Sequence, residues 1–179
     1  MKRFVFNFCL VALIACAGAS GLEPEQLALA KKKFSQLPAP NETDRQNYLI
    51  ELAGMRDRLA SSSDIEECLA VDTEIRRHPA PGDTEGYTRL IVGEWSSPRH
   101  AYLYRADGAW SMLPEEEGAT RGRWRIAGNQ FFSNADIEAE DSRTYTILLL
   151  TKDNFIFTDG DTVFYEERIR AHAGQDSRR

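Results

Sequence analysis

Polar and apolar residues alternate in short segments from Leu90 to Ile169. Turn-forming pairs such as Asp107-Gly108 and Asp159-Gly160 separate these segments. An alternation of period two places apolar side chains on one face of a strand, and tight turns join neighbouring strands in antiparallel order. Most of the aromatic residues of the chain fall in this stretch. The pattern therefore predicts an antiparallel meander of about eight strands with one buried face.

One turn in this stretch decides the register of two strands. A two-residue loop at Asp107-Gly108 would place Trp110 on the same face as a charged arginine. A three-residue loop that starts at Ala106, with Gly108 left-handed, would instead pair Tyr104 with Trp110. Because the second loop collects the large apolar residues on one face, we predict the three-residue loop.

The segment after this hairpin predicts an outward row of arginines. Trp124 and Ile126 face the core, so their neighbours Arg121, Arg123 and Arg125 face outward. An arginine row is suited to a phosphate or a carboxylate, but it is also typical of the solvated side of a half-buried strand. The loop that contains Glu115 would be able to neutralise it.

Helical periodicity dominates the residues before the meander. Glu23 to Gln36 predicts a first helix, and 41–79 predicts an antiparallel helical hairpin broken at 61–63. Capping pairs are expected at the starts of the two hairpin helices, namely Thr43 with Gln46 and Ser63 with Glu66. The second of these helices is expected to bury one apolar side, formed by Ile65, Cys68, Leu69 and Ile75.

These patterns divide the chain into six parts and predict an α+β fold. The parts are a signal peptide (1–19), a first helix and linker (20–40), the helical hairpin (41–79), a turn-rich linker (80–89), a β-barrel (90–170) and a disordered tail (171–179).

The N-terminus has the order of a bacterial secretory signal. Lys2 and Arg3 precede an apolar run that is too short to span a bilayer, and small residues follow it. The segment 13–16 resembles the lipobox of bacterial lipoproteins, which implies lipidation of Cys16. Ala17-Gly18-Ala19 fits an ordinary cleavage site equally well, in which case Cys16 is an apolar filler of the signal. We expect an exported, periplasmic protein, anchored to the outer membrane if Cys16 carries lipid.

Charge and chemistry exclude several function classes. The formal net charge is −6, and it becomes more negative when the basic signal is removed. An acidic chain without a basic stripe is a poor nucleic-acid binder, so a membrane contact is expected only through the lipid anchor. Three scattered histidines and few cysteines give no metal-ligand spacing. No catalytic constellation or cofactor motif is found, so an enzyme, a metal and a cofactor are not expected.

Gly93-Glu94-Trp95 at the start of the meander and Arg168 near its end resemble the signature of the lipocalin (calycin) family. The resemblance implies a barrel of about eight strands, in which Gly93, Trp95 and Arg168 form a structural closure with the guanidinium over the indole. Such a barrel is either filled by its side chains or holds one small ligand. The candidates for lining a ligand site are the inward residues Tyr102, Tyr104, Trp110 and Trp124.

The resemblance and the absence of catalytic motifs set the functional expectation. We expect a non-enzymatic binding or interaction module of the bacterial cell envelope, whose partner is a small apolar ligand or a protein. The alternative is an envelope inhibitor or immunity-type protein that blocks a hydrolase or a protease, which rests on fold analogy.

Overall fold

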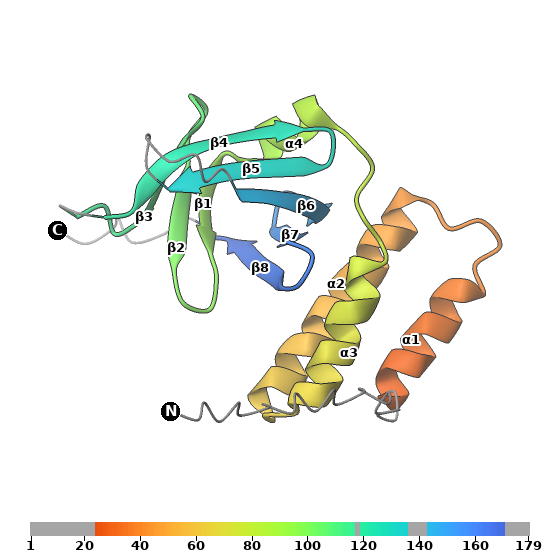
Figure 1. The fold of residues 1–179 in the computed structure, drawn as a ribbon. Coiled ribbons are helices and arrows are strands. Elements are labelled where there is room, and N and C mark those ends of the chain that lie inside the picture. The colour runs from red at the N-terminus through yellow and green to blue at the C-terminus, as the bar shows by residue number, and fades with distance from the viewer. Residues whose placement is uncertain (1–23, 117–118, 136–142, 171–179) are drawn as a thin grey trace, which may run out of the picture.

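The computed structural model describes residues 24–116, 119–135 and 143–170, and it shows helices followed by a closed β-barrel (Figure 1). The helices are α1 (Glu25–Ser35), α2 (Glu42–Ser61), α3 (Ile65–Arg76) and α4 (Thr84–Ile91). The strands are β1 (Gly93–Ser96), β2 (Ala101–Tyr104), β3 (Ala109–Leu113), β4 (Arg121–Ala127), β5 (Gln130–Ala135), β6 (Arg143–Leu150), β7 (Asn154–Thr158) and β8 (Val163–Arg168). Each strand pairs with the next, and β8 pairs with β1. The predicted α+β class and the antiparallel meander are confirmed.

The predicted turn between β2 and β3 is also confirmed. Tyr104 pairs with Trp110, and Tyr102 pairs with Met112. Gly108 has a φ of 81°, the left-handed conformation that the three-residue loop requires. Burial alternates strictly along β4, so its arginines face outward as expected.

The expectation of a turn-rich linker at 80–89 is wrong, because Thr84–Ile91 forms α4 and the barrel begins only at Gly93. The Asp83 carboxylate caps this helix by accepting a hydrogen bond from the Gly86 N–H at 2.9 Å. Tyr87 and Ile91 of α4 are buried in the barrel core. Since α4 leads directly into β1, it lies at the barrel end where β1 starts and β8 finishes.

The helical hairpin forms as predicted, but two of its details differ. α2 is capped by a reciprocal pair, Asn41 with Asp44, and α3 has no side-chain cap. α3 buries Val71 and Ile75. The predicted face is therefore wrong in part: Ile65 and Leu69 are 70% and 59% exposed. Around the axis of α3, the buried face is rotated by about a quarter turn from the face that the apolar residues predicted.

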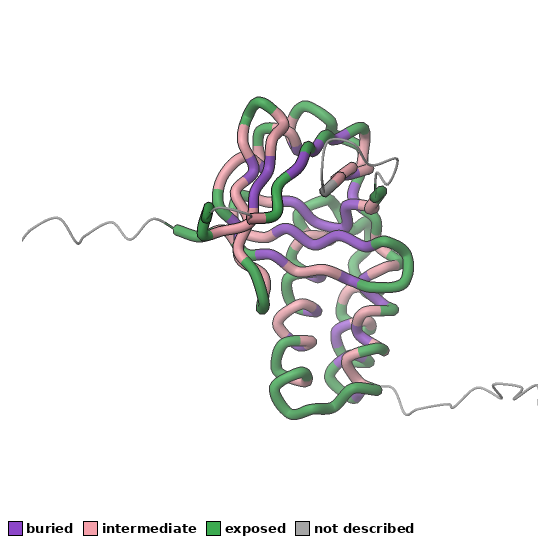
Figure 2. Tube along the Cα trace, turned by 60° about the vertical axis from the view of Figure 1, so that its left-hand side comes forward, coloured by how far each residue is buried: buried purple, intermediate pink, exposed green. Residues whose placement is uncertain are grey.

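Two hydrophobic cores result, and both use the last three strands (Figure 2). One core fills the barrel. The other lies between the helices α1–α3 and the outer face of β6–β8, where it includes Leu148, Leu149, Ile156 and Val163. A β-bulge between Ile147 and Leu149 lets two successive leucines of β6 face the helices.

A side chain of α2 ties the two parts together through backbone groups. One guanidinium nitrogen of Arg45 donates to the carbonyls of His78 at 2.9 Å and Leu148 at 2.7 Å. Glu42 holds the other side of the same guanidinium. None of the helices in the described residues is long and apolar enough to cross a membrane.

Candidate functional site

Gly93, Trp95 and Arg168 meet where the barrel closes. Trp95 and Arg168 are register partners on β1 and β8, and the Arg168 guanidinium carbon lies 4.3 Å from the centroid of the indole. Trp95 is fully buried, and its Nε1 donates to the Ile91 carbonyl of α4 at 2.6 Å. The tryptophan therefore joins helix, first strand and last strand.

The position of the Arg168 side chain explains why residue 93 is a glycine. The Arg168 guanidinium donates to the carbonyls of Leu90 and Val92 at the end of α4 and of Lys152 in the turn between β6 and β7. Gly93 has a φ of 137°, and a Cβ there would lie 2.2 Å from Arg168 Nη1. The Trp95 indole N–H and all three nitrogens of the Arg168 guanidinium donate to backbone carbonyls, so the arrangement stabilises the closed barrel.

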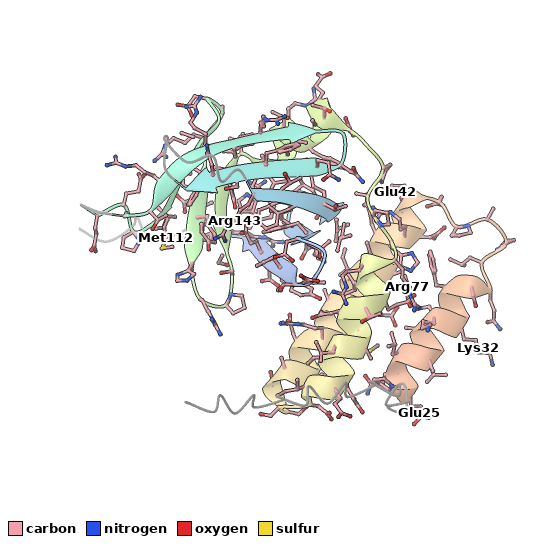
Figure 3. The ribbon with its side chains drawn as sticks, in the orientation of Figure 1. Glu25, Lys32, Glu42, Arg77, Met112 and Arg143 are labelled. Atoms are coloured by element: carbon pink, nitrogen blue, oxygen red, sulfur yellow. The ribbon has the colours of Figure 1, made fainter. Side chains whose placement is uncertain are left out.

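The four predicted ligand-lining residues do meet inside the barrel, where they pack against one another. Tyr104 makes edge-to-face contacts with Trp124 at 6.3 Å and with Phe155 at 6.5 Å between ring centroids. Tyr102 contacts Trp110 in the same way at 6.1 Å. Three of the four are buried, and Tyr102 is half-buried. Figure 3 shows this interior crowded with side chains. The rings thus form a packed aromatic core.

A carboxyl group that sequence reasoning missed lies in the same interior. Glu166 of β8 is 5% exposed, and in the described part of the chain its hydrogen-bond partner is Tyr104, whose hydroxyl lies 3.3 and 3.4 Å from the two carboxyl oxygens. Burial raises the pKa of Glu166 from about 4.5 to about 8, against the lowering effect of the Tyr104 hydrogen bond. The same burial, together with the nearby carboxyl, raises the pKa of Tyr104. Glu166 lies two residues after Phe164 on β8 and therefore shares its inward face, which was the sequence signal that could have revealed it.

A second buried carboxylate holds α1 to the hairpin. Glu74 accepts hydrogen bonds from Tyr48 at 3.1 Å, His78 at 3.1 Å and Arg77 at 3.0 Å, and Lys31 lies 3.7 Å away. Burial alone would raise the pKa of Glu74, but the bonds from His78 and Tyr48 hold it below its ordinary value.

An open groove of about 470 Å³ lies over Glu74, between α1 and α3. Phe34 of α1 stacks on Tyr48 at 4.4 Å between ring centroids, and His78 meets both rings edge-on. Lys32 stands on the outer side of α1 (Figure 3). The Glu74 carboxylate is already hydrogen-bonded to Tyr48 and His78, and the rings stack on one another, so these contacts hold the helices together.

The outer face of β4 and β5 presents a different chemistry, because cationic groups gather there. Arg123, Arg125, Phe132 and Asn134 line a shallow hollow of about 310 Å³ together with Trp124 and Ser133. The Arg125 guanidinium carbon lies 3.7 Å from the centroid of the Phe132 ring. The Glu115 carboxylate is bound by Arg105 and Ser111 and interacts electrostatically with Arg121, so it reaches one end of the arginine row, and its bonds are not to Arg123 or Arg125.

The described residues contain no cluster of three or more His, Cys, Asp or Glu side chains that could hold a metal ion. Cys68 is half-buried, and burial raises the pKa of its thiol. The lipidation candidate Cys16 and the expected tail 171–179 lie outside the described residues.

No family model, curated protein or solved structure matches the chain. The closed eight-strand antiparallel barrel preceded by helices is what the structure itself establishes.

Proposed function

We propose that this chain is a non-enzymatic interaction module of the cell envelope that binds a protein partner through the outer surface of its lipocalin-like barrel. The observation that carries the proposal is the packed barrel interior. Tyr104, Trp110 and Trp124 are 4–8% exposed and contact further aromatic rings, so an apolar ligand could enter only if these rings moved apart.

The outer surface, unlike the packed interior, has exposed side chains that a protein partner could contact. Its barrel side carries exposed arginines on β4, while its helical side carries exposed Ile65 and Leu69 on α3. Protein interfaces are enriched in arginine and apolar anchors. The proposed place in the envelope rests on the order of basic, apolar and small residues in the first 19 positions.

Photo-crosslinking tests the partner directly in the native host. A benzoylphenylalanine is placed at exposed Leu69 or at Phe132, and in a control at buried Phe155. A discrete protein adduct from Leu69 or Phe132, reproduced with the purified pair, is the expected result. No adduct from Leu69 or from half-buried Phe132 would overturn the proposal.

A ligand titration tests the competing use of the interior. Fatty acids added to the purified chain should leave the tryptophan fluorescence unchanged. Saturable quenching that a bulkier Tyr104→Trp side chain abolishes would instead show a ligand site in the barrel. Growth with labelled palmitate tests lipidation of Cys16, because only cleavage at that residue leaves a lipid-bearing product.

A further inference from the structure

The arginines of β4 are held in fixed positions before any partner arrives. The Arg125 guanidinium carbon lies over the Phe132 ring, 3.7 Å from its centroid, and Arg123 Nη2 donates to the Asp107 carbonyl at 3.0 Å. A side chain that is already held in place loses less conformational entropy when it binds. Each guanidinium keeps N–H groups beyond those used in these contacts.

The surrounding groups add further donors. Asn134 Oδ1 accepts the backbone N–H of Arg123 at 2.9 Å, so the amide NH₂ is the part of this side chain left to donate. Ser133 pairs with inward-facing Trp124, so the donors of the hollow are the two guanidinium groups and the Asn134 amide. The lining is thus rich in donors and cationic, which suits an anion.

Nearby carboxylates do not fill this role. Among the described residues, neither Arg123 nor Arg125 forms an ion pair, since Glu115 is bound to Arg105 and Ser111. The Asp107 carboxylate is used inside its own turn, where it accepts from the Ala109 N–H. The whole chain has a net charge of −6, so these two arginines without an ion pair make a locally positive patch on an otherwise acidic protein.

We propose that the hollow of Arg123, Arg125, Phe132 and Asn134 binds an acidic, extended segment of the protein partner, so this inference rests on the function proposed above. Alternate residues of a strand lie about 6.8 Å apart, and acidic side chains at alternate positions of an extended peptide repeat at the same interval. Each carboxylate can then meet one guanidinium in a two-bond contact. β4 is paired on both sides, so the segment is bound through side chains and not added to the sheet.

The test measures fluorescence anisotropy of a short labelled peptide in which glutamate and threonine alternate, with the full chain as receptor. Arg123→Gln combined with Arg125→Gln should weaken binding by about tenfold or more. The matched control combines Arg89→Gln with Arg99→Gln, two exposed arginines elsewhere that change the net charge equally, and it should stay within about twofold. Arg125→Lys keeps the charge but loses the planar fork, and should weaken binding by about threefold or more.

Three results would overturn the inference. An equal loss in the control would assign the binding to overall charge. Displacement of the peptide by polyphosphate at a lower concentration than by unlabelled peptide would assign the hollow to phosphate. Absence of peptide binding to the parent chain would also refute it.

The crosslinking experiment distinguishes failure of this site from failure of the proposed function. An adduct that forms equally well in the Arg123→Gln, Arg125→Gln chain removes the arginine site and leaves the interaction module standing. Because both side chains face outward, unchanged urea unfolding of this variant shows that its fold is intact.

Discussion

Replacing Glu166 by glutamine should make the protein more stable at neutral and alkaline pH and should remove part of its pH dependence. The folded state favours the protonated carboxyl, whose pKa is about 8, whereas the unfolded chain titrates near 4.5. Between these values the folded state binds more protons than the unfolded state. The contribution of Glu166 to stability is therefore greatest below about pH 4.5 and is lost as the pH rises toward 8.

The magnitude follows from the same two values. Each pH unit between them corresponds to about 1.4 kcal/mol, which sets an upper limit of about 5 kcal/mol on the loss. Glutamine has almost the same shape and never ionises, and its carbonyl can still accept the Tyr104 hydroxyl. At pH 5 the variant should lie within about 1 kcal/mol of the parent, and at pH 8 it should be more stable by roughly 3 kcal/mol.

The assay is urea unfolding of both chains from pH 5 to 9. The difference between them is the informative quantity, because other carboxyl groups such as Glu74 and Asp72 titrate in both chains and cancel. Glu167→Gln on the same strand is the matched control, since Glu167 is exposed, and its difference from the parent should stay flat. A flat difference for Glu166→Gln as well would refute the reasoning, because the carboxyl would then be solvated in the folded state.

Three further predictions test the fold. Gly93→Ala should destabilise the protein by roughly 2–4 kcal/mol in urea unfolding, because its Cβ would lie 2.2 Å from Arg168. The control Gly128→Ala, at a φ of 62° with no atom within 4 Å of its Cβ, should cost only about 1 kcal/mol, and equal losses in the two variants would remove the steric argument. Glu74→Gln should cost about 1–3 kcal/mol at pH 7, and the loss should shrink as the pH falls below the ordinary pKa of 4.5 and through the lowered pKa of Glu74. A loss independent of pH would contradict an ionised Glu74. Arg45→Gln should speed amide exchange in α2 more than in the barrel strands, and uniform exchange would show that this tie is unimportant.

The sequence was most informative where a backbone rule permitted one answer. Period-two alternation predicted which side of β4 is buried, and the same alternation selected the three-residue loop that pairs Tyr104 with Trp110. The contact of Trp95 with Arg168 was expected only from the resemblance of Gly93-Glu94-Trp95 and Arg168 to a known signature, and the guanidinium does lie over the indole.

Predictions failed where tertiary contacts overrode local preference. Gly86 reads as a turn former, yet it belongs to α4, where a Cβ would lie 2.1 Å from the capping carboxylate of Asp83. No sequence signal indicated that Glu74 is buried, because its carboxylate is satisfied by Tyr48 of α2 and Lys31 of α1, which are distant in sequence. Glu166 was missed because a charged residue is normally assigned to the solvated face of a strand.

Both hydrophobic cores depend on the C-terminal strands, and this determines the order in which the molecule can fold. β1 has its second partner only when β8 is present, so until then the meander has two open edges. The helices α1–α3 need the same strands, because Leu148, Ile156 and Val163 of β6–β8 complete the core against which these helices pack. Neither part can be finished before the other. Helices and barrel therefore form one cooperative unit that can close only after β8 has been synthesised, and a chain cut short before β8 would expose both apolar surfaces and both sheet edges at once.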